Sequence, residues 1–283
     1  MTEIDVIVGT RPDYIKLGPV VAALKTLRVN HEVISTGQHT TLLEGTPTTI
    51  DLALAMSLGF ASTGDVDEYT QKLIDVLRPI LRSKRPKVVV VQGDTMSAYA
   101  AAMAAFDLNI DIVHVEAGIR SGDFDNPWPE EMFRYEIDDM STWFCAATKG
   151  NRQNLLVEDT EDDHIVVTGN SIVSALARYA GDVVAKPSKQ ILITLHRREL
   201  IADVDRFNQI IVDIARAAVR NSDINFVWPL HPHVAKTKAF LMKPSNLNVI
   251  EPLPYRTFVE AMSASLGIIT DSGGACEEAA TLG

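Results

Sequence analysis

Residues 111–134, DIVHVEAGIRSGDFDNPWPEEMFR, contain a short strand, a loop and the start of a helix in direct succession. The apolar run 111–115 is typical of a buried strand, and it ends abruptly at Glu116. A Pro-Trp-Pro step then leads into a helix that begins with Glu130 and Glu131. Open α/β sheets bind their ligands just beyond the carboxyl ends of the strands. Carboxylates at this place indicate acid/base chemistry on a polar, anionic substrate.

Outward from this stretch, short β-branched runs alternate with longer segments of helical period. The alternation predicts an α/β fold built on parallel sheets. A polar segment with a proline, KPSK at residues 186–189, is the best candidate for a linker. We therefore expect two Rossmann-like domains, residues 1–185 and residues 186–283.

The same periodicity predicts the individual elements. Strands are expected at residues 5–8, 31–35, 87–91, 111–115, 142–146, 164–168, 190–195, 224–228, 247–250 and 266–270. Helices are expected at residues 13–27, 66–83, 95–106, 129–139, 149–157, 171–184, 203–220, 232–241 and 255–264, with a last helix starting near Gly273. Residues 40–65 mix threonine, glycine and small apolar residues and show no clear period.

The composition limits the class of protein and its partners. The 283 residues carry a net charge of −11, which argues against nucleic acid as the main partner, because phosphate binding needs a basic surface. No apolar run approaches the roughly 20 residues that span a bilayer, and the first residues show no signal-peptide pattern. Cys145 and Cys276 stand in no metal-ligand spacing. We expect a soluble cytoplasmic protein with no membrane partner, no metal and no cofactor.

Two glycine-containing turns join a predicted strand to a predicted helix, GTRP at residues 9–12 and DSGG at residues 271–274. The N–H groups and the dipole of a helix start favour a bound anion. In the first turn, Arg11 and Lys16 add positive charge. In the second, Ser272 suits a helix cap, and paired glycines let a phosphate approach the backbone. The alternatives are a tight turn with a surface arginine and a plain N-cap.

Three carboxylates follow predicted strands or open a helix. Asp94 and Glu116 stand at strand ends, where a buried charge is costly unless it is paired or functional. The alternative for Asp94 is the N-cap of the next helix. For Glu116 it is a salt bridge to Arg120. Glu130 and Arg134 are spaced i,i+4, so an ordinary ion pair on the helix surface is the alternative for them.

Histidines follow two strands of the second half. His196 is followed by Arg197 and Arg198, a combination that suits a diphosphate or the proton of a leaving group. An exposed basic loop is the alternative. His231 and His233 follow another strand and suit contact with a base, whereas two histidines at i,i+2 are poor evidence for a metal.

Taken together, these motifs resemble the non-hydrolysing UDP-N-acetylglucosamine 2-epimerases. The resemblance rests on GTRPDYIK at 9–16, TGQH at 36–39, VQGDT at 91–95, the stretch 111–134, HRRE at 196–199, and DSGG at 271–274 with Glu277 and Glu278. It implies a two-domain fold of the glycosyltransferase-B type with a UDP-sugar in the cleft. It also implies interconversion of UDP-GlcNAc and UDP-ManNAc through a bound 2-acetamidoglucal, without a cofactor, in a homodimer.

The resemblance also implies roles for particular residues. The catalytic residues would be Asp94, Glu116, Glu130 and His196. The substrate-binding residues would be Arg11, Lys16, Arg134, His231, Ser272, Gly273, Gly274 and Glu278, the last of them against the ribose.

This sequence departs from the family in two places. Family members continue beyond the helix that follows DSGG, so we expect an incomplete second domain and reduced activity. Some members are activated by UDP-GlcNAc through a Gln-His motif and nearby basic residues. Gln38 and His39 are present, but residues 50–65 contain no Arg or Lys, so we do not expect this control. The alternatives to an epimerase are a UDP-sugar-binding fragment impaired in catalysis and a glycosyltransferase of the same fold.

Overall fold

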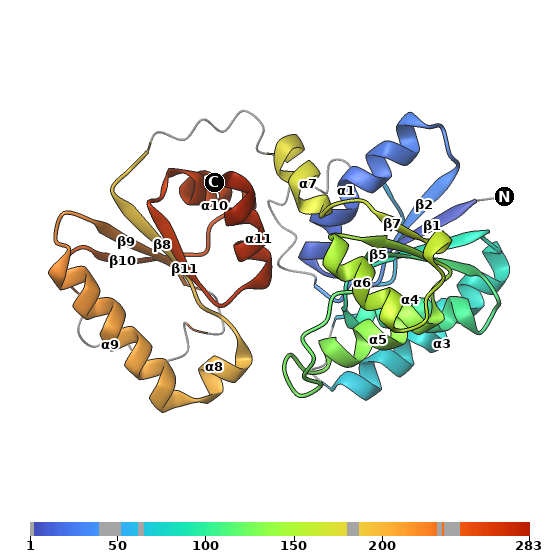
Figure 1. The fold of residues 1–283 in the computed structure, drawn as a ribbon, viewed down its shortest axis with the longest axis horizontal. Helices are drawn as coiled ribbons and strands as arrows, with labels where there is room; N and C mark the ends of the chain where they lie inside the picture. Colours follow the sequence, from blue (N-terminus) through green and yellow to red (C-terminus); the bar gives the residue numbers. More distant parts are fainter. Residues whose placement is uncertain (1–2, 40–51, 62–64, 180–186, 231–233, 235–243) are drawn as a thin grey trace. The chain divides into compact units, whose positions relative to one another are not determined.

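The structure is a computed structural model that describes residues 3–39, 52–61, 65–179, 187–230, 234 and 244–283. The chain divides into two compact units, which we call unit 1 (Met1–Arg178) and unit 2 (Tyr179–Gly283) (Figure 1). The predicted linker begins at Lys186, which lies outside the described residues. Among the residues that are described, no helix is both long enough and apolar enough to cross a membrane.

Unit 1 contains one seven-stranded sheet in the order β3-β2-β1-β4-β5-β6-β7, and every pair of neighbours is parallel. The strands are β1 (Ile4–Val8), β2 (His31–Ser35), β3 (Leu54–Ser57), β4 (Val88–Gln92), β5 (Asp111–Ala117), β6 (Trp143–Ala146) and β7 (Ile165–Val167). The helices are α1 (Arg11–Thr26), α3 (Val66–Lys84), α4 (Met96–Phe106), α5 (Glu130–Met140), α6 (Lys149–Val157), the 3-10 turn η2 (Asp162–His164) and α7 (Ser171–Tyr179), whose last residue falls in unit 2.

Helices cover both faces of this sheet (Figure 1). One core joins the sheet to α3, α4 and α5, and a second joins it to α1. Covered on both sides, β4 is an unbroken run of valines up to Gln92, VVVVQ, and such apolar runs are usual in parallel strands. The alanine-rich sequence of α4 presents small side chains, which allows α4 to pack closely between α3 and the sheet.

The strand order of unit 1 has a switch point. Starting from β1, the chain first builds outward through β2 and β3 and then returns to add β4 on the other side of β1. The connections that leave the carboxyl ends of β1 and β4 therefore run in opposite directions. Open α/β sheets bind ligands at this place.

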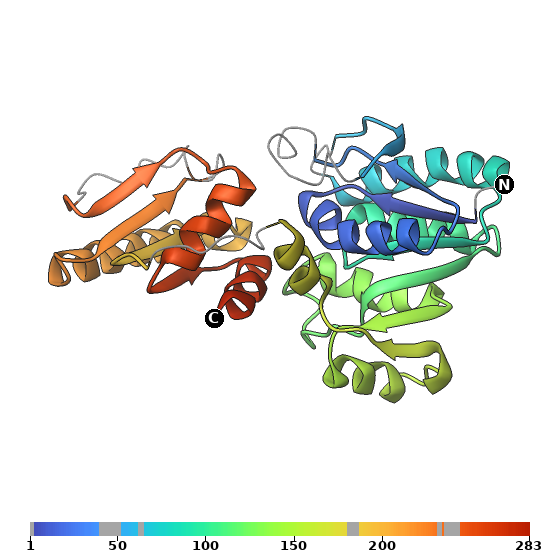
Figure 2. The ribbon, with the colours of Figure 1, turned by 90° about the horizontal axis from the view of Figure 1, so that it is seen from above.

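Unit 2 repeats this arrangement on a smaller scale. Its parallel sheet has the order β10-β9-β8-β11, with a switch point between β8 and β11. The strands are β8 (Gln190–Thr194), β9 (Asn225–Pro229), β10 (Leu247–Ile250) and β11 (Gly267–Thr270), and the helices are α8 (Arg198–Ala202), α9 (Val204–Arg220), α10 (Tyr255–Ala264) and α11 (Gly273–Leu282). Helices α8 and α9 pack in one core with the sheet, and α10 and α11 pack in another (Figures 1 and 2).

The prediction of an α/β fold with two parallel sheets is confirmed, and three elements were missed: β3, α8 and the 3-10 turn η2. Strand β3 lies in the stretch 40–65, which shows no clear period. All four of its residues are exposed, so its sequence does not alternate between buried apolar and exposed polar residues. The short α8 follows the basic motif that begins at His196. The helix predicted at 232–241 lies outside the described residues, apart from Val234. Helix α1 starts at Arg11 rather than residue 13, since Pro12 suits the first turn of a helix.

Candidate active site

Glu116 stands at a break in the regular backbone of β5. Its φ is 70°, in the left-handed region that residues other than glycine seldom adopt. The register with β6 shifts between Val115 and Ala117, so Glu116 forms a bulge that re-aims its side chain. A residue held in this region costs roughly 1–3 kcal/mol, and such residues cluster at functional sites. The backbone therefore marks Glu116 as a functional candidate independently of its charge.

The side chain of Glu116 is buried and meets two polar groups. Its Oε1 lies 2.6 Å from Nζ of Lys16, and its Oε2 accepts a hydrogen bond from the amide of Gln92. The predicted alternative, an ion pair with Arg120, is wrong, because the guanidinium of Arg120 donates to Asp138 and Glu158. Residues from α1, β4 and the end of β5 therefore meet at the switch point of unit 1.

Asp94 is paired with Arg134 of α5. The Nε and Nη2 of Arg134 lie 2.7 and 2.6 Å from Oδ2 of Asp94. The N-cap alternative for Asp94 is wrong, since the cap of α4 is Thr95, whose hydroxyl accepts from the N–H of Ala98. Gly93, the residue before Asp94, lies beside Glu116, because a Cβ built on Gly93 would be 3.7 Å from Oε2 of Glu116.

Glu131 was not among the predicted site residues, yet it holds Arg134 and the loop at Ser121 in place. Its side chain is fully buried, Oε1 accepts the N–H groups of Ser121 and Gly122, and Oε2 pairs with Nη1 of Arg134 at 2.8 Å. Burial alone would raise the pKa of Glu131, but these hydrogen bonds and Arg134 outweigh it and hold the pKa below its usual value. Arg134 thus pairs on α5 with Glu131, at i,i+3. Glu130 is the first residue of α5, half-buried at the start of the same helix.

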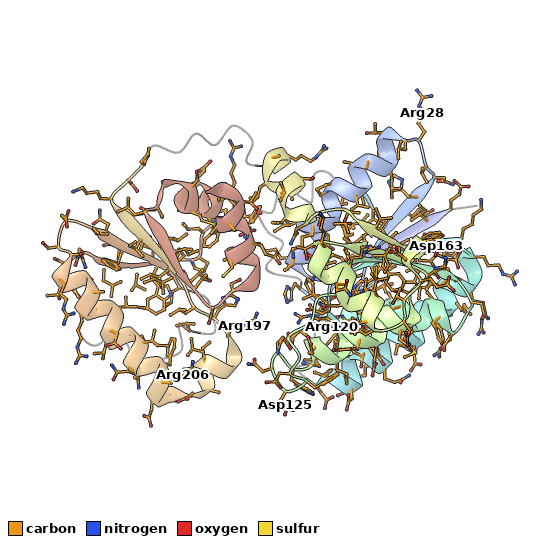
Figure 3. The ribbon with its side chains drawn as sticks, viewed as in Figure 1. Arg28, Arg120, Asp125, Asp163, Arg197 and Arg206 are labelled. Atoms are coloured by element: carbon orange, nitrogen blue, oxygen red, sulfur yellow. The ribbon has the colours of Figure 1, made fainter. Side chains whose placement is uncertain are left out.

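A second unpredicted group lies beneath these carboxylates. His114 of β5 is 1% exposed; its Nδ1 lies 2.6 Å from Oδ1 of Asp138, and its Nε2 lies 2.8 Å from the carbonyl oxygen of Gly93. The Oδ2 of Asp138 accepts the N–H of Gly118 and Nη2 of Arg120, which lies beside α5 (Figure 3). The one sign of this group in the sequence was His114, an ionisable residue within an apolar strand.

The turn after β1 binds a carboxylate of its own chain. Asp13 accepts the N–H groups of Gly9 and Thr10, both at 2.9 Å, and the hydroxyl of Thr10 at 2.8 Å. Burial raises the pKa of Asp13 to about 6, although these hydrogen bonds lower it. The turn was expected to offer N–H groups to an external anion, but Asp13 takes these two. Arg11 remains as the charge that this turn contributes.

We call Lys16, Gln92, Asp94, Glu116, Glu131 and Arg134 the carboxylate cluster.

Unit 2 holds a second group at its own switch point, where His196 follows β8 and Asp271 follows β11. Asp271 accepts the N–H groups of His196, at 2.9 and 3.0 Å, and of Arg197, at 2.8 Å. The Nε of Arg197 donates to the carbonyl oxygen of Asp271 (Figure 3). These bonds fix the β8 loop against the start of α11.

The start of α11 has the features of an anion site. The hydroxyl of Ser272 caps the helix by accepting the N–H of Ala275. Gly273 and Gly274 are exposed, and an added Cβ would meet nothing closer than 3.8 and 4.0 Å respectively. The protein's own packing therefore does not require glycine at either position. We call His196, Asp271, Ser272, Gly273 and Gly274 the helix-start cluster.

The remaining predicted binding residues are placed differently. Glu278, one turn further into α11, is buried, and its Oε1 accepts the hydroxyl of Tyr255 at 2.8 Å. His231 lies outside the described residues. Within the described residues, one group, Glu161, Asp163 and His164, brings three potential metal ligands within 4.8 Å of one another. Exposed acidic groups of this kind are common without an ion, and this group shares no residue with the two clusters.

Comparisons with known proteins agree with this arrangement. The family profile described as UDP-N-acetylglucosamine 2-epimerase matches residues 22–283. The UDP-N-acetylglucosamine 2-epimerase of Salmonella typhimurium is 36% identical, over 97% of this chain and 78% of its own length. The crystal structure of UDP-GlcNAc 2-epimerase from Neisseria meningitidis, bound to UDP-GlcNAc, matches with a TM-score of 0.90 at 32% identity, covering 100% of this chain and 81% of that one.

Proteins of low sequence identity share this fold. Spinosyn forosaminyltransferase SpnP matches with a TM-score of 0.59 at 12% identity, over 98% of this chain and 76% of that one, a likeness of fold alone. The two units are Rossmann-like and of the glycosyltransferase-B type, as expected. With the family profile covering most of its length and a curated relative above 30% identity, this chain belongs to the UDP-N-acetylglucosamine 2-epimerase family.

Proposed function

We propose that this chain interconverts UDP-GlcNAc and UDP-ManNAc. The observation that carries the proposal is the carboxylate cluster, in which Asp94 and Glu116 are each paired with a cation at a switch point. Membership of the family supports 2-epimerisation as the reaction that this cluster catalyses. The Neisseria relative, whose crystal structure contains UDP-GlcNAc, supports a UDP-sugar as the substrate.

The proposed reaction is an elimination followed by an addition. A base removes the proton from C2 while the bond between C1 and the diphosphate oxygen breaks, which leaves 2-acetamidoglucal and UDP. UDP then adds back to C1, and a proton returns to C2 on the opposite face. No electrons leave the substrate, so the scheme needs no redox cofactor.

In this scheme, the carboxylates of unit 1 remove the proton from C2 and return it. Asp94, Glu116 and Glu130 exchange it at the two faces of C2, since proton transfer requires carboxylates within hydrogen-bond reach of that carbon. Lys16 and Arg134 orient Glu116 and Asp94 and provide the counter-charge that buried carboxylates need.

The residues of unit 2 hold UDP and stabilise it as it leaves. His196 and the start of α11 face the charge that develops on the diphosphate, where fixed donors are most effective. Arg11 is a further proposed substrate-binding residue. His231 contacts the nucleotide, and Glu278 binds the ribose. Unit 1 is thus the acid/base domain and unit 2 the UDP-binding domain, and the boundary predicted at residue 185 lies a few residues beyond the end of unit 1 at Arg178.

Two further properties belong to the proposal. We expect a homodimer, which light scattering of the purified protein tests directly. We also expect the protein to act in the cytoplasm, because its two cysteines, Cys145 and Cys276, are both unpaired.

The decisive assay is conversion from both directions. Purified protein is incubated separately with UDP-GlcNAc and with UDP-ManNAc, and the sugars are separated by chromatography. The same equilibrium mixture is expected from either start. Tight UDP binding without conversion indicates a binding protein instead, and sugar transfer to an added acceptor indicates a glycosyltransferase.

A further inference from the structure

The buried pair of His114 and Asp138 contacts every element of unit 1 that presents a proposed acid/base residue. His114 belongs to β5, two residues before Glu116, and its Nε2 bonds the carbonyl of Gly93, the residue before Asp94. Asp138 belongs to the last turns of α5, whose first residue is Glu130. The two meet at 2.6 Å, with side chains that are 1% and 4% exposed.

The chemistry of the hydrogen-bond partners assigns the protonation state of this pair. A carbonyl oxygen only accepts, so Nε2 of His114 carries a hydrogen toward Gly93. Asp138 already accepts the N–H of Gly118 and the guanidinium of Arg120 on Oδ2, which favours its ionised form. An ionised carboxylate also only accepts, so Nδ1 of His114 carries a hydrogen as well. His114 is therefore an imidazolium with two donors.

The charged groups around His114 agree with this state. Asp138 faces it from α5 and Asp94 acts on it from the end of β4, while Arg120 contacts Asp138 rather than the imidazole. Burial opposes the charge, but the two carboxylates and the bond to Gly93 outweigh it and raise the pKa of His114.

We propose that His114 and Asp138 are positioning residues that set the placement of Asp94 and Glu116 together. The imidazolium holds the backbone at Gly93, and Asp138 holds the backbone at Gly118, two residues beyond the bulge at Glu116. The cation acts on the reaction only through these contacts, so proton transfer at C2 depends on it and UDP binding does not. This inference rests on the proposed function.

The first test uses the unaltered protein. The ring nitrogens of His114 are observed by NMR in ¹⁵N-histidine-labelled protein, with the signals assigned from the backbone of the same residue. Both ring N–H groups are expected to persist as the pH rises past 6.5, the ordinary pKa of histidine, because the pKa of His114 is raised. A ring that becomes neutral at or below that ordinary value overturns the proposal, and this result needs neither a variant nor turnover.

The second test measures His114→Gln, Asp138→Asn and the double variant. A change of about 1 Å in a reacting group costs on the order of 100-fold, so kcat is expected to fall by roughly 10- to 100-fold while UDP affinity is retained. The double variant is expected to be no slower than the slower single variant, because the two residues act as one unit. His164→Gln, which removes a half-buried histidine beside Glu161, away from both clusters, is the matched control and is expected to keep wild-type kcat.

Two outcomes of the second test contradict the proposal. Folded variants that keep wild-type kcat show that the pair does not position the carboxylates. Loss of UDP affinity with unchanged kcat shows an effect on binding instead. Absence of any turnover in the unaltered protein is a different result, because it refutes the proposed function while the NMR measurement still decides the state of His114.

Discussion

Lys16 and Glu116 are 100 residues apart in the chain, and their side chains meet at 2.6 Å. Lys16 belongs to α1, which follows β1, and Glu116 ends the regular part of β5, so the pair spans the end of β4 that lies between them. Both side chains are nearly buried, at 10% and 5% exposure. The pair is therefore a buried salt bridge that links α1 to β5 across the switch point, and both residues belong to the carboxylate cluster.

Removal of one partner of this pair is expected to destabilise unit 1. Lys16→Met deprives Glu116 of a buried counter-charge, which typically costs about 3–5 kcal/mol. The double variant Lys16→Met, Glu116→Gln removes both charges and is expected to lose less stability than the sum of the single variants. Urea unfolding followed by circular dichroism measures each free energy of unfolding. Additive losses would show that the two charges do not interact.

Glu116→Gln tests the acid/base role directly. The amide keeps the size of the side chain but loses the ability to take a proton, so kcat is expected to fall by roughly 10²- to 10⁴-fold with UDP affinity unchanged. Glu68→Gln, on the exposed first turn of α3, is the control and is expected to behave as wild type. Full activity in the Glu116 variant would favour a reaction that needs no base at this position, as in a glycosyltransferase.

Gly273→Ala separates ligand binding from folding in unit 2. The structure has room for the methyl group, with the nearest atom at 3.8 Å, so stability is expected to stay the same or rise by up to about 1 kcal/mol. UDP affinity is expected to fall at least about tenfold, or roughly 1.4 kcal/mol, because the methyl group takes the place of a phosphate at the helix start. Calorimetric titration with UDP and a thermal melt give the two quantities, and retained affinity would exclude a phosphate from this position.

The contribution of His114 and Asp138 to stability is expected to depend on pH in both directions. The pKa of Asp138 lies below its ordinary 3.8, because His114 and Arg120 outweigh the effect of burial, so its contribution is lost as pH falls through the folded-state value. The pKa of His114 lies above its ordinary 6.5, so its contribution is complete below 6.5 and is lost as pH rises through the raised value.

The difference in unfolding free energy between wild type and Asp138→Asn is therefore expected to be largest between about pH 4 and 6.5. It should shrink on either side of this range. Urea unfolding of both proteins at a series of pH values checks this window, and a difference that stays constant with pH would show that the pair is not ionised.

The sequence predicted the fold and the strand-end positions of the candidate residues, because both follow from local patterns. Glu116 ends an apolar run and Ser272 precedes paired glycines, and each lies at a switch point of its sheet. The partners of these residues did not follow from local spacing. Arg120 is four residues from Glu116, yet the bulge turns Glu116 toward Lys16, on a different helix.

The supporting residues were missed for a related reason. Glu131 and Asp138 stand on a helix with three other acids, none of which is fully buried, and only burial against the loop at Ser121 and against His114 distinguishes the two. Burial of this kind depends on how α5 packs against β5, which is a tertiary relationship. Asp13 shows the same limit, since its position predicts a favourable acid at a helix start but not its occupation of the turn's own N–H groups.

The central claim, proton exchange at C2 by Asp94, Glu116 and Glu130, is tested most directly by incubating the protein with UDP-GlcNAc in D₂O. Proton NMR of the recovered sugars then reports the hydrogen at C2. We expect deuterium at C2 of the UDP-ManNAc formed and, as the reaction approaches equilibrium, of the UDP-GlcNAc that remains, and we expect none with Glu116→Gln over the same time. UDP-ManNAc that forms with its C2 hydrogen fully retained, or deuterium incorporation that is unaffected in Glu116→Gln, would contradict the account.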